Sequence, residues 1–185
     1  MKSLTQTRTV ARAWDRAALL ELKTGVQDIG VVDRASFPQP TEAIQQSPVT
    51  DFRARIARTT AAGKVATGLR QLRLIDAELQ ADIVRIALTF LEDFERRMAN
   101  LRIEVVDTQA CPKFHCDNVY VRLVTTYVGP ATEYQFVGES AIQRAKPGSL
   151  VFLKGHQHPT HRDSVHHRSP AIPHGARRLC VVLDC

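Results

Sequence analysis

The chain has 185 residues, a formal net charge of +6 and 44% hydrophobic residues. This length and composition suit one domain with a real core and exclude wholesale disorder. The basic residues are spread over both halves without interleaved stacking aromatics, so nucleic-acid binding is not expected. No segment reaches the roughly 18 apolar residues of a membrane span, so no membrane partner is expected.

Cysteine usage predicts the redox compartment. The chain has four cysteines, and none forms a CxxC pair. The N-terminal stretch MKSLTQTRTV lacks the apolar core of a signal peptide. We therefore expect reduced thiols in a cytoplasmic protein.

The first hundred residues are predicted to be mainly helical. An amphipathic helix is expected at residues 10–25, and a proline-rich loop follows at 37–50. Residues 50–63 favour a short second helix. The clearest helical period lies within residues 75–100, where Asp76 suits the N-cap position.

The residue pattern changes near residue 101, where short β-branched and apolar runs alternate with Gly, Pro and polar turns. These runs lie at 101–108, 119–129, 132–138, 148–155 and 177–184. The pattern indicates a small antiparallel sandwich or barrel. We therefore predict one compact α+β domain, in which a helical part (residues 1–100) packs on a β unit (residues 101–185).

The histidines are confined to the predicted β unit. Six of the seven lie between His115 and His167, and the seventh is His174. His115 and Asp117 stand two residues apart in KFHCDN, just ahead of a β run, and alternate residues of a strand share one face. A further histidine from VHHRSP would complete a set of two imidazoles and one carboxylate, which is typical of non-haem Fe(II) oxygenases.

The order of four motifs resembles that of the Fe(II)/2-oxoglutarate-dependent oxygenases. The motifs are HxD, the Pro-Gly turn and strand KPGSLVFLKG, VHHRSP, and GARRLCVVLD. In that class, HxD and the distal histidine bind iron within a double-stranded β-helix, and a later arginine binds the far carboxylate of 2-oxoglutarate. The resemblance implies iron ligands His115, Asp117 and His167, with His166 as the alternative, and a carboxylate clamp at Arg177 with Arg178 second.

A second resemblance is to the bacterial family called domain of unknown function DUF1826. It rests on KFHCDNVYVRLVTTYVGPATEY, GSLVFLKG and VHHRSP followed by RRLCVVLD. Ala131 stands where that family usually has glycine. The doubled histidine leaves His166 and His167 both open as the third ligand. This resemblance implies the same site but no particular reaction.

The alternation of side chains along a strand predicts which residues face the predicted site. If the run after Asp117 is a regular strand, Arg122 lies with Cys116 on the opposite face, as part of a structural ion pair. Arg177 and Arg178 face opposite ways for the same reason. The one that points into the barrel needs an anionic partner, because an unpaired buried guanidinium is costly.

Another group of histidines lies in the polar loop HQHPTH. It comprises His156, His158 and His161. The composition suits a second, weaker metal-binding loop, a lid over the barrel mouth, or a solvated loop. The sequence leaves these three readings open.

Two functions fit these observations. The leading hypothesis is an Fe(II)/2-oxoglutarate-dependent oxygenase that hydroxylates an unidentified small molecule or peptide. The alternative is a cupin-like protein that binds Zn²⁺ or another divalent metal in metal homeostasis, without oxygenase activity. Both use the same three ligands, and a homodimer is compatible with either.

Overall fold

The computed structural model describes residues 12–25 and 27–185. The stretch MKSLTQTRTV, for which no signal peptide is predicted, therefore lies outside the described residues. Within the described part, no helix combines the length and the apolar character needed to cross a membrane.

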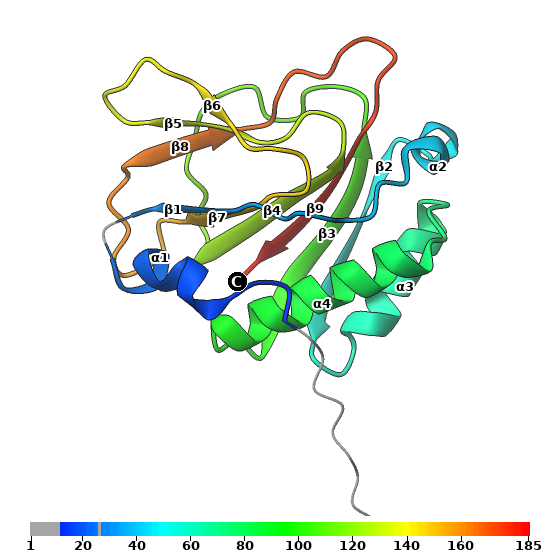
Figure 1. The fold of residues 1–185 in the computed structure, drawn as a ribbon, viewed down its shortest axis with the longest axis horizontal. Coiled ribbons are helices and arrows are strands. Elements are labelled where there is room, and N and C mark those ends of the chain that lie inside the picture. Colours follow the sequence, from blue (N-terminus) through cyan, green and yellow to red (C-terminus); the bar gives the residue numbers. More distant parts are fainter. Residues whose placement is uncertain (1–11, 26) are drawn as a thin grey trace, which may run out of the picture.

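Five helical segments and two antiparallel sheets make up the described fold (Figure 1). The helical segments are η1 (Arg16–Leu19), α1 (Leu20–Thr24), α2 (Thr41–Gln46), α3 (Ala61–Gln71) and α4 (Ala77–Asp93). The strands are β1 (Ile29–Val32), β2 (Thr50–Ala57), β3 (Met98–Val106), β4 (Val121–Val128), β5 (Glu133–Phe136), β6 (Gln143–Arg144), β7 (Leu150–Lys154), β8 (Val165–Arg168) and β9 (Arg178–Asp184). The larger sheet has the order β1-β7-β4-β9-β3-β2, and the smaller one has the order β6-β5-β8.

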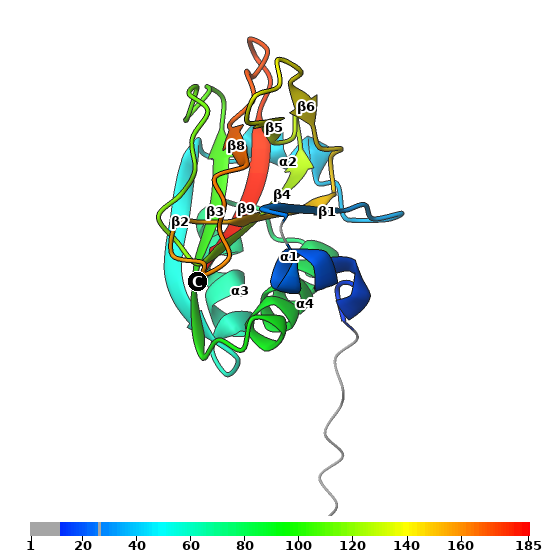
Figure 2. The same ribbon diagram turned by 90° about the vertical axis from the view of Figure 1, so that its left-hand side faces the viewer.

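Helix α4 packs on one face of the larger sheet, beside α3 (Figure 2). The Asp76 side chain caps the helix by accepting a hydrogen bond from the Leu79 amide, which confirms the predicted start. Ile83, Ile86 and Phe90 recur at helical spacing and are fully buried against the sheet. The main hydrophobic core therefore lies between α4 and the strands.

Side chains alternate between the two faces along β3 and β9, and along β4 as far as the irregularity between Thr126 and Val128. The helix-facing set is apolar and buried in the main core: Leu101, Ile103, Val105, Val121, Leu123, Leu179, Val181 and Leu183. The opposite set lines a cavity: Arg102, Glu104, Arg122, Val124, Arg178, Cys180 and Val182. One face of the sheet thus builds the core, and the other carries the charged groups.

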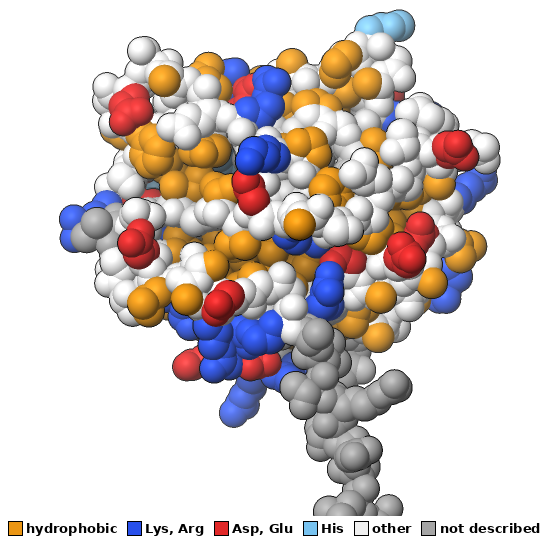
Figure 3. Space-filling view, viewed as in Figure 1, with side chains coloured by type: hydrophobic (Ala, Val, Ile, Leu, Met, Phe, Trp, Pro, Cys, Tyr) orange, Lys and Arg blue, Asp and Glu red, His pale blue; other side chains and the backbone are white. Residues whose placement is uncertain are grey.

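The smaller sheet packs against the larger one at strands β1 and β7. A second apolar cluster joins β1 and β7 to the smaller sheet, and it includes Ile29, Val151, Leu153 and Val165. The space-filling view shows exposed apolar side chains over β1 and α1 (Figure 3). This surface includes a groove lined by Leu20, Val31, Tyr134 and Phe136, among others, with no histidine or cysteine in its lining. The candidate chemistry therefore lies elsewhere.

The helix predicted for residues 50–63 is wrong over its first half. Strand β2 occupies Thr50–Ala57 and pairs with β3 along its whole length. Ile56 is buried and Ala54 packs against the core, while Arg53 and Arg55 alternate with them toward the opposite face. Over so few residues, the two-residue period of a strand with alternating arginines resembles a helical pattern. Because β1 and β2 both precede residue 100, that position does not divide helices from strands.

Candidate metal centre

His115 and His167 are joined by an isolated antiparallel bridge. Each backbone amide donates to the carbonyl of the other residue, and both N···O distances are 3.0 Å. The two imidazole ring centroids lie 4.6 Å apart. The bridge therefore brings the HxD segment and β8 into register, so that both rings reach the same point.

Asp117 closes this group from the loop that precedes β4. Its Oδ2 atom lies 3.1 Å from His167 Nε2, and its Oδ1 atom lies 3.6 Å from His115 Nε2. One ligand atom from each of the three residues falls within 4.8 Å of the others. The structure thus gathers the three residues that the sequence proposed as a triad.

The tautomer of His115 is set by its neighbour. Its Nδ1 atom lies 2.9 Å from the carbonyl oxygen of Lys113, a partner to which only an N–H can donate. This contact places the proton on Nδ1 and leaves the Nε2 lone pair facing Asp117 and His167. A metal ligand is oriented by the same kind of outer hydrogen bond.

The protonation states of the other two residues also suit coordination. Burial raises the pKa of Asp117, but the contact with His167 and the charge of Arg122 outweigh this effect and lower the pKa overall. Burial lowers the pKa of His167 and outweighs the opposing pull of Asp117. At neutral pH the centre therefore offers a carboxylate and a neutral imidazole, the forms that bind metals.

One buried atom of this centre is left without a partner. Asp117 Oδ2 is inaccessible to solvent and has no hydrogen bond from any described residue. His167 Nε2 is near it, but the two atoms are not aligned as donor and acceptor. A cation between them would satisfy both lone pairs, so the residues present fit a divalent metal.

Arg122 forms an ion pair, as predicted, but it also contacts Asp117 and so belongs to this centre, which the parity argument did not predict. Its Nη1 atom lies 2.5 Å from Asp117 Oδ1, while Nε and Nη2 hold Asp184 at 2.7 and 2.8 Å. The parity argument failed because Asp117 lies in a loop and β4 begins only at Val121. Arg122 therefore holds Asp117 in place from the cavity side.

The centre opens into a cavity of about 230 Å³ between the two sheets. Arg178, Arg102 and Glu104 lie in its lining. Arg178 is buried, donates to the carbonyl of Pro130 and to Thr126 Oγ1, and lies 4.0 Å from Glu104. Arg102 lies 3.3 Å from the same carboxylate, and its buried Nε atom has no hydrogen-bond partner in the described chain. Two guanidinium groups thus share one carboxylate, so Arg102, Arg178 and Glu104 together carry a net charge of +1.

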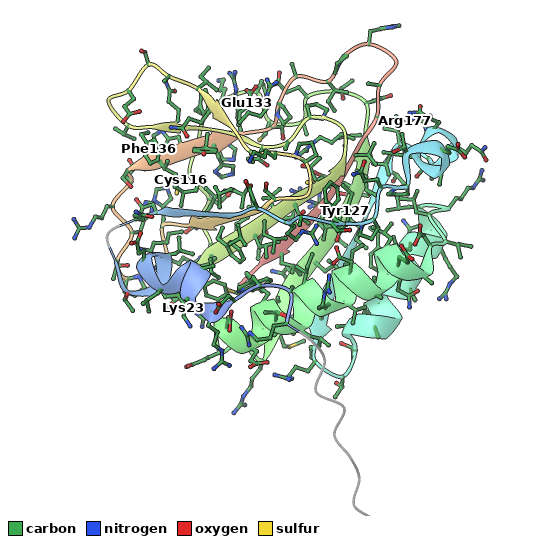
Figure 4. The ribbon with its side chains drawn as sticks, viewed as in Figure 1. Lys23, Cys116, Tyr127, Glu133, Phe136 and Arg177 are labelled. Carbon is green, nitrogen blue, oxygen red and sulfur yellow. The ribbon has the colours of Figure 1, made fainter. Side chains whose placement is uncertain are left out.

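Of the two arginines predicted for the carboxylate clamp, Arg178 lines the cavity and Arg177 does not. Arg177 turns away from the cavity and donates to the backbone carbonyls of Ile44 and Ser47 at the end of α2. Figure 4 shows it beside α2, far from Cys116. Of this pair, Arg178 faces the cavity. The sequence predicted that Arg177 and Arg178 face opposite ways. It did not predict that Arg178 is the one that faces the cavity.

The two adjacent histidines, His166 and His167, also face opposite ways. His167 is buried and lies in the cavity wall. His166 points outward from β8, and its Nε2 atom lies 2.9 Å from Asp163 Oδ1. Only His167 of this pair therefore meets His115 and Asp117.

The charged cavity residues that were not predicted as site residues include Arg102, Glu104, Arg122 and Arg168. The run LRIEVV carried a usable signal for the first two, because charged residues alternate strictly with apolar ones. Cys116, which the sequence placed beside the triad without a ligand role in it, does not line the cavity. Burial, with a contribution from the charge of Asp117, raises the pKa of Cys116 to about 11, so the metal-free side chain is a neutral thiol.

Solved structures show which fold this chain resembles. The chain is similar to JOX2 in complex with 2OG, Fe and JA, with 9% identity, a TM-score of 0.50, and coverage of 85% of this chain and 67% of that one. It is also similar to the viral collagen prolyl hydroxylase vCPH from Paramecium Bursaria Chlorella virus-1 in a 2OG complex (10% identity, TM-score 0.48, 85% and 94% coverage). Full-length Neurospora crassa T7H in complex with alpha-KG gives 12% identity, a TM-score of 0.47, and 92% and 77% coverage. The fold is the double-stranded β-helix of the 2-oxoglutarate oxygenases, within an α+β domain.

The family follows from the sequence itself. Residues 2–184 match the family described as Protein of unknown function (DUF1826), and the chain belongs to that family. No curated protein matches it. Both resemblances drawn from the motifs are thereby confirmed, one at the level of the family and one at the level of the fold.

Proposed function

We propose that this protein is a non-haem Fe(II)/2-oxoglutarate-dependent oxygenase that hydroxylates a small molecule or peptide. One observation carries the proposal: His115, Asp117 and His167 converge at the wall of a cavity that also contains the buried Arg178. Two imidazoles and one carboxylate leave the coordination positions that a co-substrate and oxygen require.

The cavity charge supports a dicarboxylate co-substrate. Arg178 and Arg102 share Glu104, so an anion entering the cavity would meet an unbalanced guanidinium. Pairing a buried guanidinium with a carboxylate is favourable when both are desolvated and well oriented. Arg178 takes the clamp role that the sequence resemblance assigned first to Arg177.

The metal, when bound, would supply the activation of oxygen coupled to decarboxylation of 2-oxoglutarate. Residues of this chain would orient the ligands and limit the access of water. Lys113 orients the His115 ring, Arg122 holds Asp117, and the apolar side chains Val124 and Val182 help to limit water in the cavity.

The test is co-substrate dependence. Anaerobic addition of Fe(II) and then 2-oxoglutarate to the purified protein is expected to produce a weak visible charge-transfer band. Addition of oxygen is then expected to yield succinate. Tight Zn²⁺ binding with neither the band nor succinate would instead support the alternative, a divalent-metal-binding protein without oxygenase activity.

A further inference from the structure

A second cluster of metal-binding side chains lies behind the HxD segment. Ligand atoms of Cys116, His156 and His161 all fall within 4.8 Å of one another. Cys116 Sγ lies 3.7 Å from His161 Nε2, and the rings of His156 and His161 are 4.9 Å apart. None of these three residues lines the cavity that contains His115 and Asp117. The two clusters are therefore separate, although they meet in adjacent residues of the chain.

The loop that carries the two histidines is fastened to the HxD segment by its backbone. The amide of His156 donates to the carbonyl of Asp117, and the amide of Gln157 donates to that of Val119. Gly155 allows this close approach, because a Cβ atom there would lie 2.1 Å from the Val119 oxygen. The positions of the histidines relative to Cys116 are thus set by the fold.

His161 is oriented as a ligand would be. Its Nδ1 atom is buried, has no hydrogen-bond partner among the described residues, and lies 3.8 Å from Asp28 Oδ1. Asp28 is itself held by the Ser164 hydroxyl and by the amides of Ser164 and Arg162. The Asp28 carboxylate therefore stands behind Nδ1 beyond hydrogen-bond distance, while Nε2 faces the Cys116 thiol and is the nitrogen placed to meet a metal.

His158 plays a different part in the same loop. Its ring packs on Tyr120 at 4.4 Å between centroids, and its Nδ1 atom accepts a hydrogen bond from the Thr160 amide. It is buried and does not belong to the cluster. Of the three histidines in this loop, the structure brings His156 and His161 to Cys116 and leaves His158 outside the cluster.

We infer that Cys116, His156 and His161 form a second metal site that takes a zinc-class divalent cation. One sulfur and two imidazole nitrogens are a borderline-soft donor set, which favours Zn²⁺ and its analogue Co²⁺ over Mg²⁺, Ca²⁺ or Mn²⁺. Tetrahedral coordination then leaves one position for water or for Asp163, whose Oδ1 atom lies 3.9 Å from His161 Nε2. This site does not depend on the proposed oxygenase function.

The experiment uses Co²⁺ as the probe, because only a thiolate ligand gives a strong near-ultraviolet sulfur-to-cobalt band. The full chain is expected to show this band on titration with Co²⁺. The Cys116→Ser variant is expected to lose it and to bind Zn²⁺ at least about 100-fold more weakly. His156→Ala should weaken Zn²⁺ binding similarly, and this exposed residue can be replaced without disturbing the core.

Two controls separate this site from the triad. Cys111→Ser removes the exposed thiol that lines the triad cavity and is expected to keep the band. His115→Ala should keep the band while the total metal stoichiometry falls by one. Zn²⁺ should still raise the unfolding temperature of this variant, since a ligand that binds the native state stabilises it.

Several outcomes would overturn the inference. They are the absence of the band in the native protein, its survival in Cys116→Ser, or its loss in Cys111→Ser. Should Cys116→Ser unfold, the His156→Ala result decides. Unchanged Zn²⁺ affinity in that variant contradicts the site.

Discussion

His115 and His167 exchange both backbone hydrogen bonds of an antiparallel bridge, at 3.0 Å each. This pairing joins the loop before β4 to β8, two segments that lie far apart in the sequence. Backbone hydrogen bonds hold the two imidazoles in place, so the site geometry does not rest on side-chain contacts alone. Replacement of a triad side chain should therefore leave the bridge intact.

Asp117→Ala and His167→Ala are each expected to weaken Fe(II) binding by at least about 100-fold, because each removes a ligand atom. His166→Ala is the matched control, since that ring points outward to Asp163. Anaerobic Fe(II) titration measures the effect. Equal loss in His166→Ala and His167→Ala would count against the assignment of the third ligand.

Arg122→Gln is expected to weaken Fe(II) binding by about 10- to 100-fold while all three ligands remain. The reason is that Arg122 holds Asp117 Oδ1 and so fixes the orientation of the carboxylate. Arg122→Lys should recover part of the affinity, which a merely structural role would not require. Arg53→Gln, an exposed arginine outside the triad cavity, serves as the control. Identical affinities in all three variants would remove the positioning role.

Arg178→Met is expected to raise the Kd for 2-oxoglutarate by at least about 30-fold, because loss of a buried charged partner costs 2 kcal/mol or more. Arg177→Met is the matched control and should leave the Kd unchanged, since Arg177 binds the carbonyls near α2. Isothermal titration of the Fe(II)-loaded protein measures both. A larger effect at Arg177 would restore the assignment suggested by the motif.

Asp82→Asn is expected to destabilise the fold by about 3 kcal/mol near neutral pH, because it breaks a buried ion pair. Asp82 on α4 accepts hydrogen bonds from Arg34 at 2.6 Å and from the Tyr127 hydroxyl at 2.8 Å. Burial raises the pKa of Asp82, but these partners outweigh it and lower the pKa overall. Urea unfolding measures the free energy, and Glu139→Gln at an exposed position should change it by less than about 0.5 kcal/mol.

The pH dependence of the same pair has a defined sign. Because the folded-state pKa of Asp82 is lowered, its stabilisation is complete above the unfolded value of about 3.9. It is lost as the pH falls through the folded-state value. The difference in the free energy of unfolding between the native protein and Asp82→Asn should therefore become smaller in acid. A gap that widens below about pH 4 would contradict the ion-pair account.

Local periodicity predicted those features that depend on neighbours in the chain. The 3.6-residue repeat of Ile83, Ile86 and Phe90 marked α4, and its N-cap was found at Asp76. The β runs after residue 101 were found because their apolar residues alternate. Local periodicity gave a wrong prediction for residues 50–57, which form a strand. A strand with a basic outer face resembles a short amphipathic helix.

By itself, the sequence determined the motif order, the chemical types of the three proposed ligands and the alternation that separates core from cavity. Only the tertiary structure decided that His167 rather than His166, and Arg178 rather than Arg177, faces the cavity. It alone brought Cys116 to His156 and His161. The physical reason is register: a shift of one residue turns every side chain to the other face, and pairing between distant strands sets that register.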